Sequence, residues 1–394
     1  MGGQTRSPLR RNEMNDQLLR THLYDWHRSH GDVIDFAGWE MPVRYTDIRE
    51  EHMAVREAVG IFDTTHMYRF IIRGPQAVDF LQTVTTNNVR KLRVGMGHYS
   101  TCLNEHGGTR DDLMLYRIGE SEFVWVTNAS NGPKIHSHLL EHSKRFDVIV
   151  EDKSREIAMI AVQGPRALEL LSRMAETDVS EFPRFSITRL KLLGQDCFLC
   201  RTGYTGEAGG EILLLDTPFT DEGRAKATSF WEDILERGAD LGVKPCGLGA
   251  RDSTRLEAGF VLYGHELDEN TSPIEARIPY AVKFKVDPHY IGYDVVLRHK
   301  KEGVEKTRIG FVMVDRGIPR QGYRVLKDGV EIGLVTSGGL SPVLGKGIGM
   351  AFVKPDIVAE TDVIEIDIKG RIRRAEVTSW PFYDTERYGE GRSS

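Results

Sequence analysis

Two acidic residues follow a pair of glycines in the stretch NEHGGTRDDL, residues 104–113. Glycine lets the backbone approach a ligand closely, because it has no Cβ atom. A carboxylate at the edge of such a loop can orient an amine or exchange its proton, as a general base does. Alternatively, one of Asp111 and Asp112 caps a turn and the other faces solvent. The pattern alone leaves both roles open for Asp111.

A third carboxylate, Glu211, begins a predicted strand after the glycine-rich stretch RTGYTGEAGG, residues 201–210. A carboxylate pairs well with a planar edge that carries two N–H donors, such as an aminopyrimidine, because two parallel hydrogen bonds form. Arg251 opens a predicted helix, where its charge opposes the helix dipole. We therefore expect Arg251 either to bind an anion or to pair with a neighbour such as Glu257.

Four tyrosines are candidates to stack on a flat ring: Tyr99, Tyr116, Tyr204 and Tyr263. Tyrosine in a mixed sheet more often belongs to the core, so this alternative stays open. Together with the carboxylates and the arginine, these residues indicate a flat, nitrogen-rich ligand with a carboxylate tail.

The elements that must position these residues fall into two similar halves. Residues 70–84 (FIIRGPQAVDFLQTV) and 160–174 (IAVQGPRALELLSRM) each join a β-rich run, a Gly-Pro pair and an amphipathic pattern. Proline suits the first helical position, which predicts helices that begin at Pro75 and Pro165. We interpret the repeat as a duplication. Pseudo-symmetry would then bring acidic residues of both halves together at a ligand cavity.

Helical periodicity also predicts helices over residues 47–58, 221–237 and 247–258. Helices and strands do not alternate strictly, which favours an α+β region over a doubly wound sheet. From about residue 300, six short apolar runs separated by turn residues predict a small β-barrel or sandwich. Asp328-Gly329 between two of these runs is typical of a tight hairpin turn, and Lys369-Gly370 is another candidate turn.

Three motifs lack part of the pattern that a ligand site needs. GLGARD, residues 247–252, ends in Asp where a dinucleotide fingerprint has glycine. GLSPVLGKG, residues 339–347, has one residue too many between its glycines for a phosphate-binding loop. Cys197 and Cys200 lie in a predicted strand, where residues three apart face opposite sides. Two buried structural cysteines are therefore favoured over a metal or redox pair.

Composition excludes several classes of protein. The chain has 394 residues and a net charge of −6, which argues against a general nucleic-acid binder. No apolar run reaches the roughly 20 residues of a membrane span. Four cysteines form no disulfide framework, so we expect a cytoplasmic protein. The histidines show no metal-ligand spacing, and we expect His66 to be packed or to face solvent.

Seven stretches occur in a characteristic order along residues 20–385: DFAGWEMPVRY, FDTTHM, NEHGGTRDDL, AVQGP, TGYTGEAGGEI, KPCGLGARDSTRLEAGFVLYGHELDE and TSGGLSPVLGKGIGMAFV. Together they resemble the aminomethyltransferase (T-protein) family of the glycine cleavage system. The resemblance implies an α+β fold, in which a folate-binding region of two related α+β subdomains precedes a small C-terminal β-barrel. The limits we expect are a mobile N-terminal arm over 1–18, the folate-binding region over 19–298 and the barrel over 299–394.

The resemblance also implies an enzyme. It would transfer the methylene carbon of S-aminomethyl-dihydrolipoyl H-protein to tetrahydrofolate and release ammonia. Tetrahydrofolate would be a co-substrate, lipoylated H-protein the partner, and no metal, NAD, flavin, nucleic acid or membrane would be involved. The alternative is a tetrahydrofolate-dependent demethylase of a sulfonium or methyl-ether substrate, since few residues near the folate separate the two reactions. A folate-binding accessory protein of iron–sulfur assembly would need a Lys-Gly-Cys-Tyr segment where this chain has TGYTGE.

Site residues follow from the same resemblance, position by position. It implies that Asp111 is the catalytic aspartate, that Glu211 anchors the pterin with Tyr204 as its companion, and that Arg251 binds the ligand. Further positions around the folate are Tyr99, Tyr116, Met67 and Asn128, with Arg387 in the loosely aligned C-terminal tail.

Overall fold

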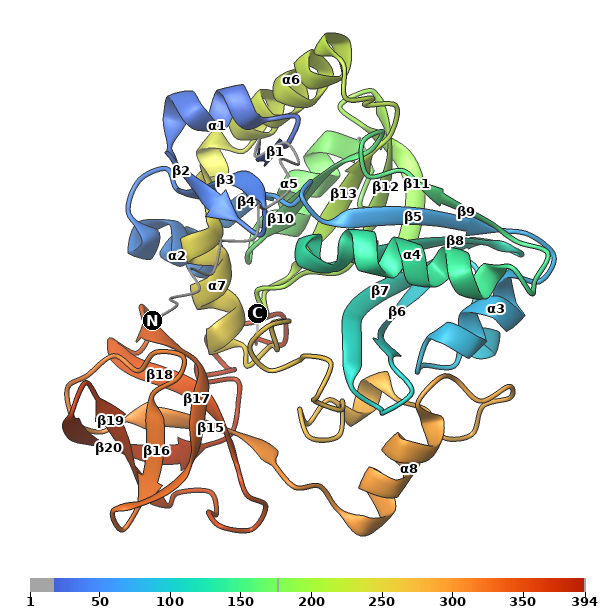
Figure 1. The fold of residues 1–394 in the computed structure, drawn as a ribbon. Helices are drawn as coiled ribbons and strands as arrows, with labels where there is room; N and C mark the ends of the chain where they lie inside the picture. The colour runs from blue at the N-terminus through green and yellow to red at the C-terminus, as the bar shows by residue number, and fades with distance from the viewer. Residues whose placement is uncertain (1–17, 176, 393–394) are drawn as a thin grey trace, which may run out of the picture.

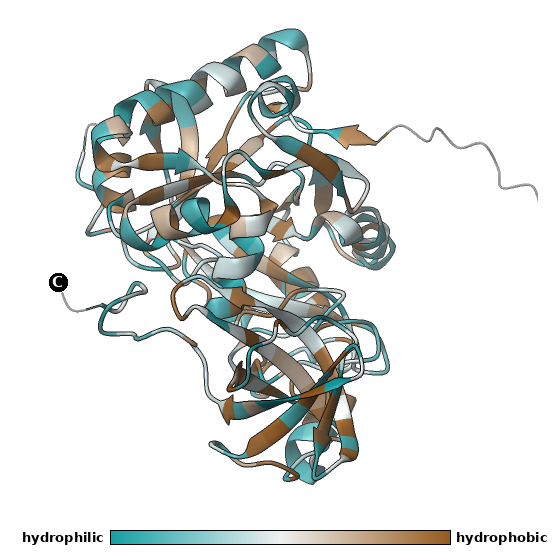
Figure 2. Ribbon diagram, turned by 90° about the vertical axis from the view of Figure 1, so that its left-hand side faces the viewer, coloured by the Kyte–Doolittle hydropathy of each residue, from teal (hydrophilic) through white to brown (hydrophobic). Residues whose placement is uncertain are grey.

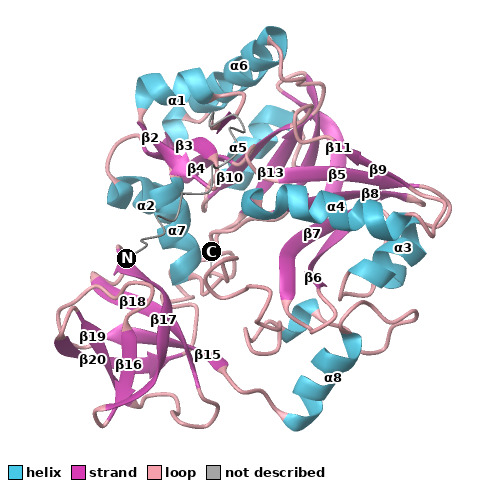
Figure 3. Ribbon diagram, viewed as in Figure 1, coloured by secondary structure: helices cyan, strands magenta, loops and turns pink. Residues whose placement is uncertain are grey.

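The computed structural model describes residues 18–175 and 177–392. The N-terminal arm expected over 1–18 lies outside the described residues, apart from residue 18. The described chain forms a mixed region of helices and sheets, which is followed by a closed β-barrel (Figures 1 and 3). The predicted α+β class with a C-terminal barrel is therefore confirmed.

Two sheets with the same internal order make up most of the mixed region. The first has the strand order β6-β7-β8-β5-β9 and the second β11-β12-β13-β10-β4-β14. In each half one strand, a helix and three further strands follow in sequence, and these four strands pair in the same order. This structural repeat agrees with the predicted duplication. The strands are β4 (Val59–Asp63), β5 (Tyr68–Arg73), β6 (Met96–Leu103), β7 (Thr109–Gly119), β8 (Glu122–Thr127), β9 (Ile149–Asp152), β10 (Ala158–Gln163), β11 (Ile187–Leu192), β12 (Gln195–Cys200), β13 (Gly209–Leu214) and β14 (Val243–Pro245).

The two Gly-Pro pairs form matching turns between strand and helix. Gly74 has φ 141° and Gly164 has φ 137°, a region that other residues rarely adopt. Each glycine carbonyl accepts a hydrogen bond of 3.0 Å from the first residue of the helix that follows. The helices α3 (Ala77–Val84) and α5 (Ala167–Ala175) thus begin two residues after the prolines. The prediction that proline itself opens each helix was wrong, because both prolines occupy the tight turn instead.

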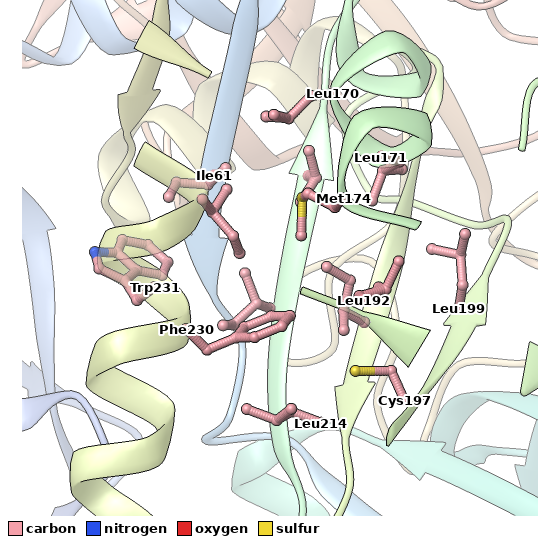
Figure 4. Close-up of a cluster of buried hydrophobic side chains, with 14 of the residues drawn as sticks. Ile61, Leu170, Leu171, Met174, Leu192, Cys197, Leu199, Leu214, Phe230 and Trp231 are labelled. Carbon is pink, nitrogen blue, oxygen red and sulfur yellow. The ribbon is translucent and has the colours of Figure 1, made fainter. Parts of the chain in front are cut away.

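The sheets pack face to face and helices cover their outer faces. Residues of β7 and β8 share an apolar cluster with residues of β10 and β12 between the sheets. Helices α3 and α4 (Gly132–Ser143) cover the first sheet. Helices α5 and α6 (Asp221–Arg237) cover the second, where Leu170, Phe230 and Trp231 pack against the strands (Figure 4). Hydrophobic residues accordingly concentrate on the strands, with hydrophilic residues along the outer helices (Figure 2).

The predicted helices over 47–58, 221–237 and 247–258 are confirmed. They are α2 (Ile48–Glu57), α6 and α7 (Leu248–Glu257). Asp47 caps α2 by accepting a hydrogen bond of 2.9 Å from the backbone N–H of Arg49. Cys197 and Cys200 are buried in different clusters on the two faces of the second sheet, as their spacing predicts. The N-terminal elements are α1 (Tyr24–His30) and a small sheet of β1 (Leu19–Arg20), β2 (Asp32–Phe36) and β3 (Trp39–Arg44).

The C-terminal strands close into a barrel with the order β15-β18-β17-β16-β19-β20. Asp328-Gly329 and Lys369-Gly370 have positive φ values and connect successive strands, as the hairpin signals predict. The expected boundary after residue 298 falls inside α8 (Tyr293–Glu302), because the charged residues there form the exposed face of an amphipathic helix. The strands are β15 (Thr307–Met313), β16 (Arg324–Lys327), β17 (Val330–Ser341), β18 (Lys346–Val353), β19 (Val363–Ile368) and β20 (Arg371–Thr378).

Candidate active site

A cavity of about 730 Å³ is lined by residues of both sheets, of α7 and of the C-terminal tail. Its size lies within the range of roughly 300–1,000 Å³ that is typical of small-molecule sites. Asp112 of β7 and Glu211 of β13 both line it. The predicted meeting of acidic residues from the two halves is therefore present in the structure. Of the other expected residues, Tyr99, Tyr204, Arg251, Met67 and Asn128 also line the cavity.

Asp111 and Asp112 lie on opposite faces of the first sheet, because successive residues of a strand alternate. Asp112 lines the cavity, whereas Asp111 is not among its lining residues and is 0% exposed. Asp111 shares its face with Leu113 and Leu115, which pack under α3 and α4. The structure thus places the second aspartate where the sequence resemblance puts the first.

Four donors surround the buried carboxylate of Asp111. Its oxygens accept hydrogen bonds from the Asn128 backbone N–H at 3.0 Å, from Asn128 Nδ2 at 2.7 Å and from Asn131 Nδ2 at 2.7 Å. The Thr127 hydroxyl is the fourth donor. Burial, and then the charge of Asp112, raises the pKa of Asp111 to about 7, while the donors oppose this rise. Asp111 therefore ties the end of β8 and the start of α4 to β7.

Asp112 is held from two sides at the cavity wall. Tyr99 donates a hydrogen bond of 2.8 Å to Oδ2, and Asn128 Nδ2 donates one of 2.9 Å to Oδ1. Burial raises the pKa of Asp112 above its usual value. A carboxylate with a raised pKa and a fixed orientation is suited to accept a proton near neutral pH.

Glu211 presents one carboxylate oxygen without a partner. Its Oε2 accepts a hydrogen bond of 2.6 Å from Thr202, and no hydrogen bond within the described part of the chain reaches Oε1. Tyr116 OH lies 2.6 Å from Thr202 Oγ1 and donates to it, because Thr202 gives its only proton to Glu211. Tyr116 itself is buried and does not line the cavity, so it acts on the site only through Thr202. Burial raises the pKa of Glu211.

Arg251 supplies a cation that forms no salt bridge within the described part of the chain. Its guanidinium lies 4.9 Å from the centre of the Tyr204 ring and donates to Met67 Sδ at 3.7 Å. No salt bridge involves Arg251 among residues 18–175 and 177–392, and Glu257 pairs with Arg56 instead. Of the two expectations for Arg251, the ion pair with Glu257 was wrong, and its charge stays available to a ligand.

The C-terminal tail reaches the cavity through Glu390 rather than Arg387. Arg387 is exposed and does not line the cavity. Glu390 lines it, and its carboxylate lies 2.8 Å from Arg184 Nε and 3.5 Å from Arg201. The weak alignment of the tail therefore pointed to a residue just outside the site.

Sequence reasoning missed His66 as a cavity residue. We expected it to be packed or to face solvent, and the structure places it, nearly buried, in the cavity wall. Its neighbour Met67 was expected near the ligand, which was the one signal that pointed to this segment.

The described residues contain neither a metal-binding cluster nor a membrane-spanning helix. Across 18–175 and 177–392, no group of three or more His, Cys, Asp or Glu side chains is arranged to hold a metal ion. In that same part of the chain, no helix combines the length and apolar character needed to cross a membrane.

Comparisons with known proteins agree with this architecture. The GCVT N-terminal domain family matches residues 23–286, and the glycine cleavage T-protein C-terminal barrel domain family matches residues 306–384. A probable aminomethyltransferase of Pyrococcus horikoshii is 41% identical over 94% of this chain and 98% of its own length. An aminomethyltransferase of Geobacillus sp. is 42% identical over 93% of this chain and 99% of its own.

A solved structure has the same fold. The crystal structure of glycine cleavage system aminomethyltransferase T from Bartonella henselae superposes with a TM-score of 0.86 at 32% identity, and covers 95% of this chain and 100% of its own. Family matches and relatives over 40% identical thus span nearly the whole chain. The chain therefore belongs to the glycine cleavage T-protein family, and it is an aminomethyltransferase of the glycine cleavage system.

Proposed function

We propose that the cavity binds tetrahydrofolate, which receives the methylene carbon of the aminomethyl group on the dihydrolipoyl arm of H-protein. The observation that carries this proposal is the presence in one cavity of Glu211, with a free oxygen, and Asp112, held by Tyr99 and Asn128. A reduced folate has a pyrimidine edge with N–H donors at one end of its ring system and secondary amines at the other. The two carboxylates match these two ends.

The transfer breaks two bonds of the donor and forms two bonds to folate. The methylene carbon loses its bonds to sulfur and to the amino nitrogen, and gains bonds to two nitrogens of tetrahydrofolate. The two protons leave those nitrogens, and one returns to sulfur as the thiol while the other completes ammonia. Holding both substrates in one cavity supplies much of the acceleration, since oriented partners react as if at very high concentration.

We assign the proton transfer to Asp112. Its carboxylate lines the cavity, and burial raises its pKa toward the range where a carboxylate serves as a base at neutral pH. The sequence resemblance implies this role for Asp111, but Asp111 lies behind the strand with its oxygens occupied by four donors. Asp111 is therefore a positioning residue, which acts on the site through Asn128.

The remaining residues form the binding surface in this proposal. Glu211 pairs with the pyrimidine edge through its free oxygen, and Thr202 holds its other oxygen. Arg251 contributes a positive charge that forms no salt bridge within the described residues, and the nearby Glu211 interacts with this charge. Tyr204 stacks with Phe260 at a centroid distance of 5.9 Å and supports Arg251 from below. Met67 and Tyr99 complete the wall.

The decisive experiment incubates the protein with aminomethylated H-protein and tetrahydrofolate. Formation of ammonia and methylene-tetrahydrofolate in equal amounts is the expected result. Parallel reactions replace the donor with a sulfonium compound or a methoxy-aromatic compound. Methyl transfer from these donors, without ammonia release from aminomethylated H-protein, would favour the demethylase alternative and contradict the proposal.

A further inference from the structure

His66 lines the cavity but has no hydrogen-bond partner. The residue is only 4% exposed, and its Nδ1 atom is fully buried without a partner among the described residues. Nε2 also has no partner there, but unlike Nδ1 it is not fully buried, so it is the ring nitrogen that a ligand in the cavity could contact. A buried imidazole that has lost water without gaining another partner raises the free energy of the ligand-free protein.

Two structural histidines, His27 and His52, are satisfied on both ring nitrogens. His27 contacts Asp63 and Tyr45, each at 2.8 Å. His52 contacts Ser253 at 2.8 Å and Glu257 at 2.9 Å. The ring of His66, which has no partner on either nitrogen among the described residues, therefore differs from the rings of His27 and His52.

Three other histidines also have a buried ring nitrogen without a partner among the described residues. They are His22, His98 and His138. None of the three lines the cavity. A buried unpaired nitrogen alone thus does not identify a ligand contact, and among the histidines of the described residues only His66 combines one with a place in the cavity wall. His98 provides a matched control.

The ring of His66 is held in place before any ligand arrives. It follows β4 in a turn where the Thr64 N–H donates to the Met159 carbonyl at 2.9 Å, and Thr65 Oγ1 donates to the same carbonyl at 3.1 Å. The Phe36 ring packs edge-to-face against the imidazole, with centroids 5.8 Å apart and an angle of 85° between the planes. This support gives the free nitrogen a fixed position, which favours binding because little freedom is lost.

Charge around His66 restricts the group that it could contact. Burial, and then the nearby Arg251, lowers the pKa of His66 to about 3, so the imidazole is neutral at pH 7. A protonated amine at His66 would be repelled by Arg251, which forms no salt bridge among the described residues. A neutral imidazole beside this arginine suits an uncharged polar atom on a flat ring.

We propose that His66 Nε2 forms a hydrogen bond with an uncharged polar atom of the bound pteridine, beside Arg251. This proposal rests on the assignment of the cavity to tetrahydrofolate. His66 is then a ligand-binding residue, whose Nε2 atom gains a partner only when the ligand binds.

The binding test compares tetrahydrofolate dissociation constants of the wild type, His66→Phe, His66→Gln and His98→Phe by calorimetry. We expect His66→Phe to weaken binding about 10- to 100-fold, because the ligand atom is left unpaired. We expect His66→Gln, whose amide can replace the Nε2 hydrogen bond, to stay within about threefold, and His98→Phe to match the wild type. Unchanged binding by His66→Phe, or an equal loss in His66→Gln or His98→Phe, would overturn the proposal.

Thermal unfolding without ligand provides a readout that does not depend on folate. We expect His66→Phe to unfold at the wild-type temperature or above it, because the substitution removes an unpaired buried nitrogen. A clear fall in this temperature would mean that His66 has a structural role, and would overturn the inference. If the wild type fails to bind tetrahydrofolate, the proposed function fails instead, and the two failures are thereby distinguished.

Discussion

The side-chain amide of Asn128 donates to both neighbouring aspartates, to Asp111 at 2.7 Å and to Asp112 at 2.9 Å. One of these carboxylates is sealed behind the first sheet and the other lines the cavity. The amide therefore connects a buried anchor to the group that faces the ligand. The orientation of Asp112 depends on this connection as well as on Tyr99.

Replacing Asp112 with Asn should lower turnover far more than it weakens folate binding. A general base is worth roughly 10²- to 10⁴-fold in rate, and an amide at this position cannot accept the proton. The measurement is kcat in the H-protein assay together with the dissociation constant of tetrahydrofolate. Equal losses in kcat and in affinity would assign Asp112 to binding instead.

Asn128→Ala should reduce kcat at least tenfold, because Asp112 loses the donor that fixes Oδ1. Asn131→Ala is the matched control, since Asn131 donates to Asp111 and not to Asp112. We expect this control to reduce kcat by a smaller factor. If both variants lose the same activity, the shared amide has no special role in positioning Asp112.

The rate should fall as pH decreases below neutral, because burial raises the pKa of Asp112 and protonation of this carboxylate removes the base. Asp111→Asn should leave this acidic limb nearly in place, since the charge of Asp112 raises the pKa of Asp111 and Asp112 therefore ionises first. Profiles of kcat between pH 5 and 9 test this, and a limb that moves clearly in Asp111→Asn would contradict this order of ionisation.

The ionisation of Asp111 also makes the free energy of unfolding depend on pH. Between about pH 4 and 7 the folded protein binds more protons at Asp111 than the unfolded chain, because its folded pKa is raised. The contribution of Asp111 to the free energy of unfolding therefore decreases as pH rises through this window.

Glu211→Ala should weaken tetrahydrofolate binding about 10- to 100-fold. The substitution removes the free carboxylate oxygen, and with it the hydrogen bond that this oxygen would accept from the pyrimidine edge. The effect on kcat at saturating folate should be smaller. Calorimetry measures the affinity, with Glu331→Ala, an exposed position on the barrel, as the control. An unchanged dissociation constant in Glu211→Ala would remove Glu211 from the binding surface.

The buried pair of His27 and Asp63 should dominate the stability of the N-terminal elements. Their side chains are 2.8 Å apart and 0% exposed, so His27→Phe should cost about 3–5 kcal/mol by leaving a buried charge unpaired. The exposed pair of Asp32 and Arg44 is the control, and Asp32→Asn should cost at most about 1 kcal/mol. Urea unfolding measures both free energies, and similar values for the two variants would contradict the prediction.

The ionisation of Asp63 also makes the stabilisation by this pair depend on pH. Although burial acts against it, the hydrogen bond from His27 helps to hold the pKa of Asp63 well below its usual value. A carboxyl group with a depressed folded pKa stabilises the protein above its unfolded pKa, near 4, and this stabilisation is lost as pH falls further. Acid unfolding of Asp63→Asn should therefore be less steep than that of the wild type.

Local signals in the sequence predicted much of the architecture. The paired Gly-Pro turns marked the duplication because few residues other than glycine adopt the φ values of Gly74 and Gly164. Asp328-Gly329 marked a hairpin for the same reason. These features depend on backbone geometry within a few residues, so the sequence carries them directly.

Local signals could not predict which of Asp111 and Asp112 lines the cavity. The strand β7 is buried on both faces, so Leu113 on one face and Met114 on the other are both apolar. The sequence of this strand therefore does not show which residues face the cavity. A bulge at Arg110 adds a residue to β7 relative to its partner β6. Simple alternation along the strand therefore does not assign residues on the two sides of the bulge to the correct face. The position of His66 likewise depends on contacts between segments that are distant in sequence.

A crystal structure with bound tetrahydrofolate tests most directly whether the two carboxylates hold one pteridine. We predict the pyrimidine edge against Glu211 Oε1 and a reactive folate nitrogen within hydrogen-bond distance of Asp112, with Asp111 unchanged behind the sheet. A folate bound elsewhere, or one in this cavity that contacts neither Glu211 nor Asp112, would contradict that arrangement.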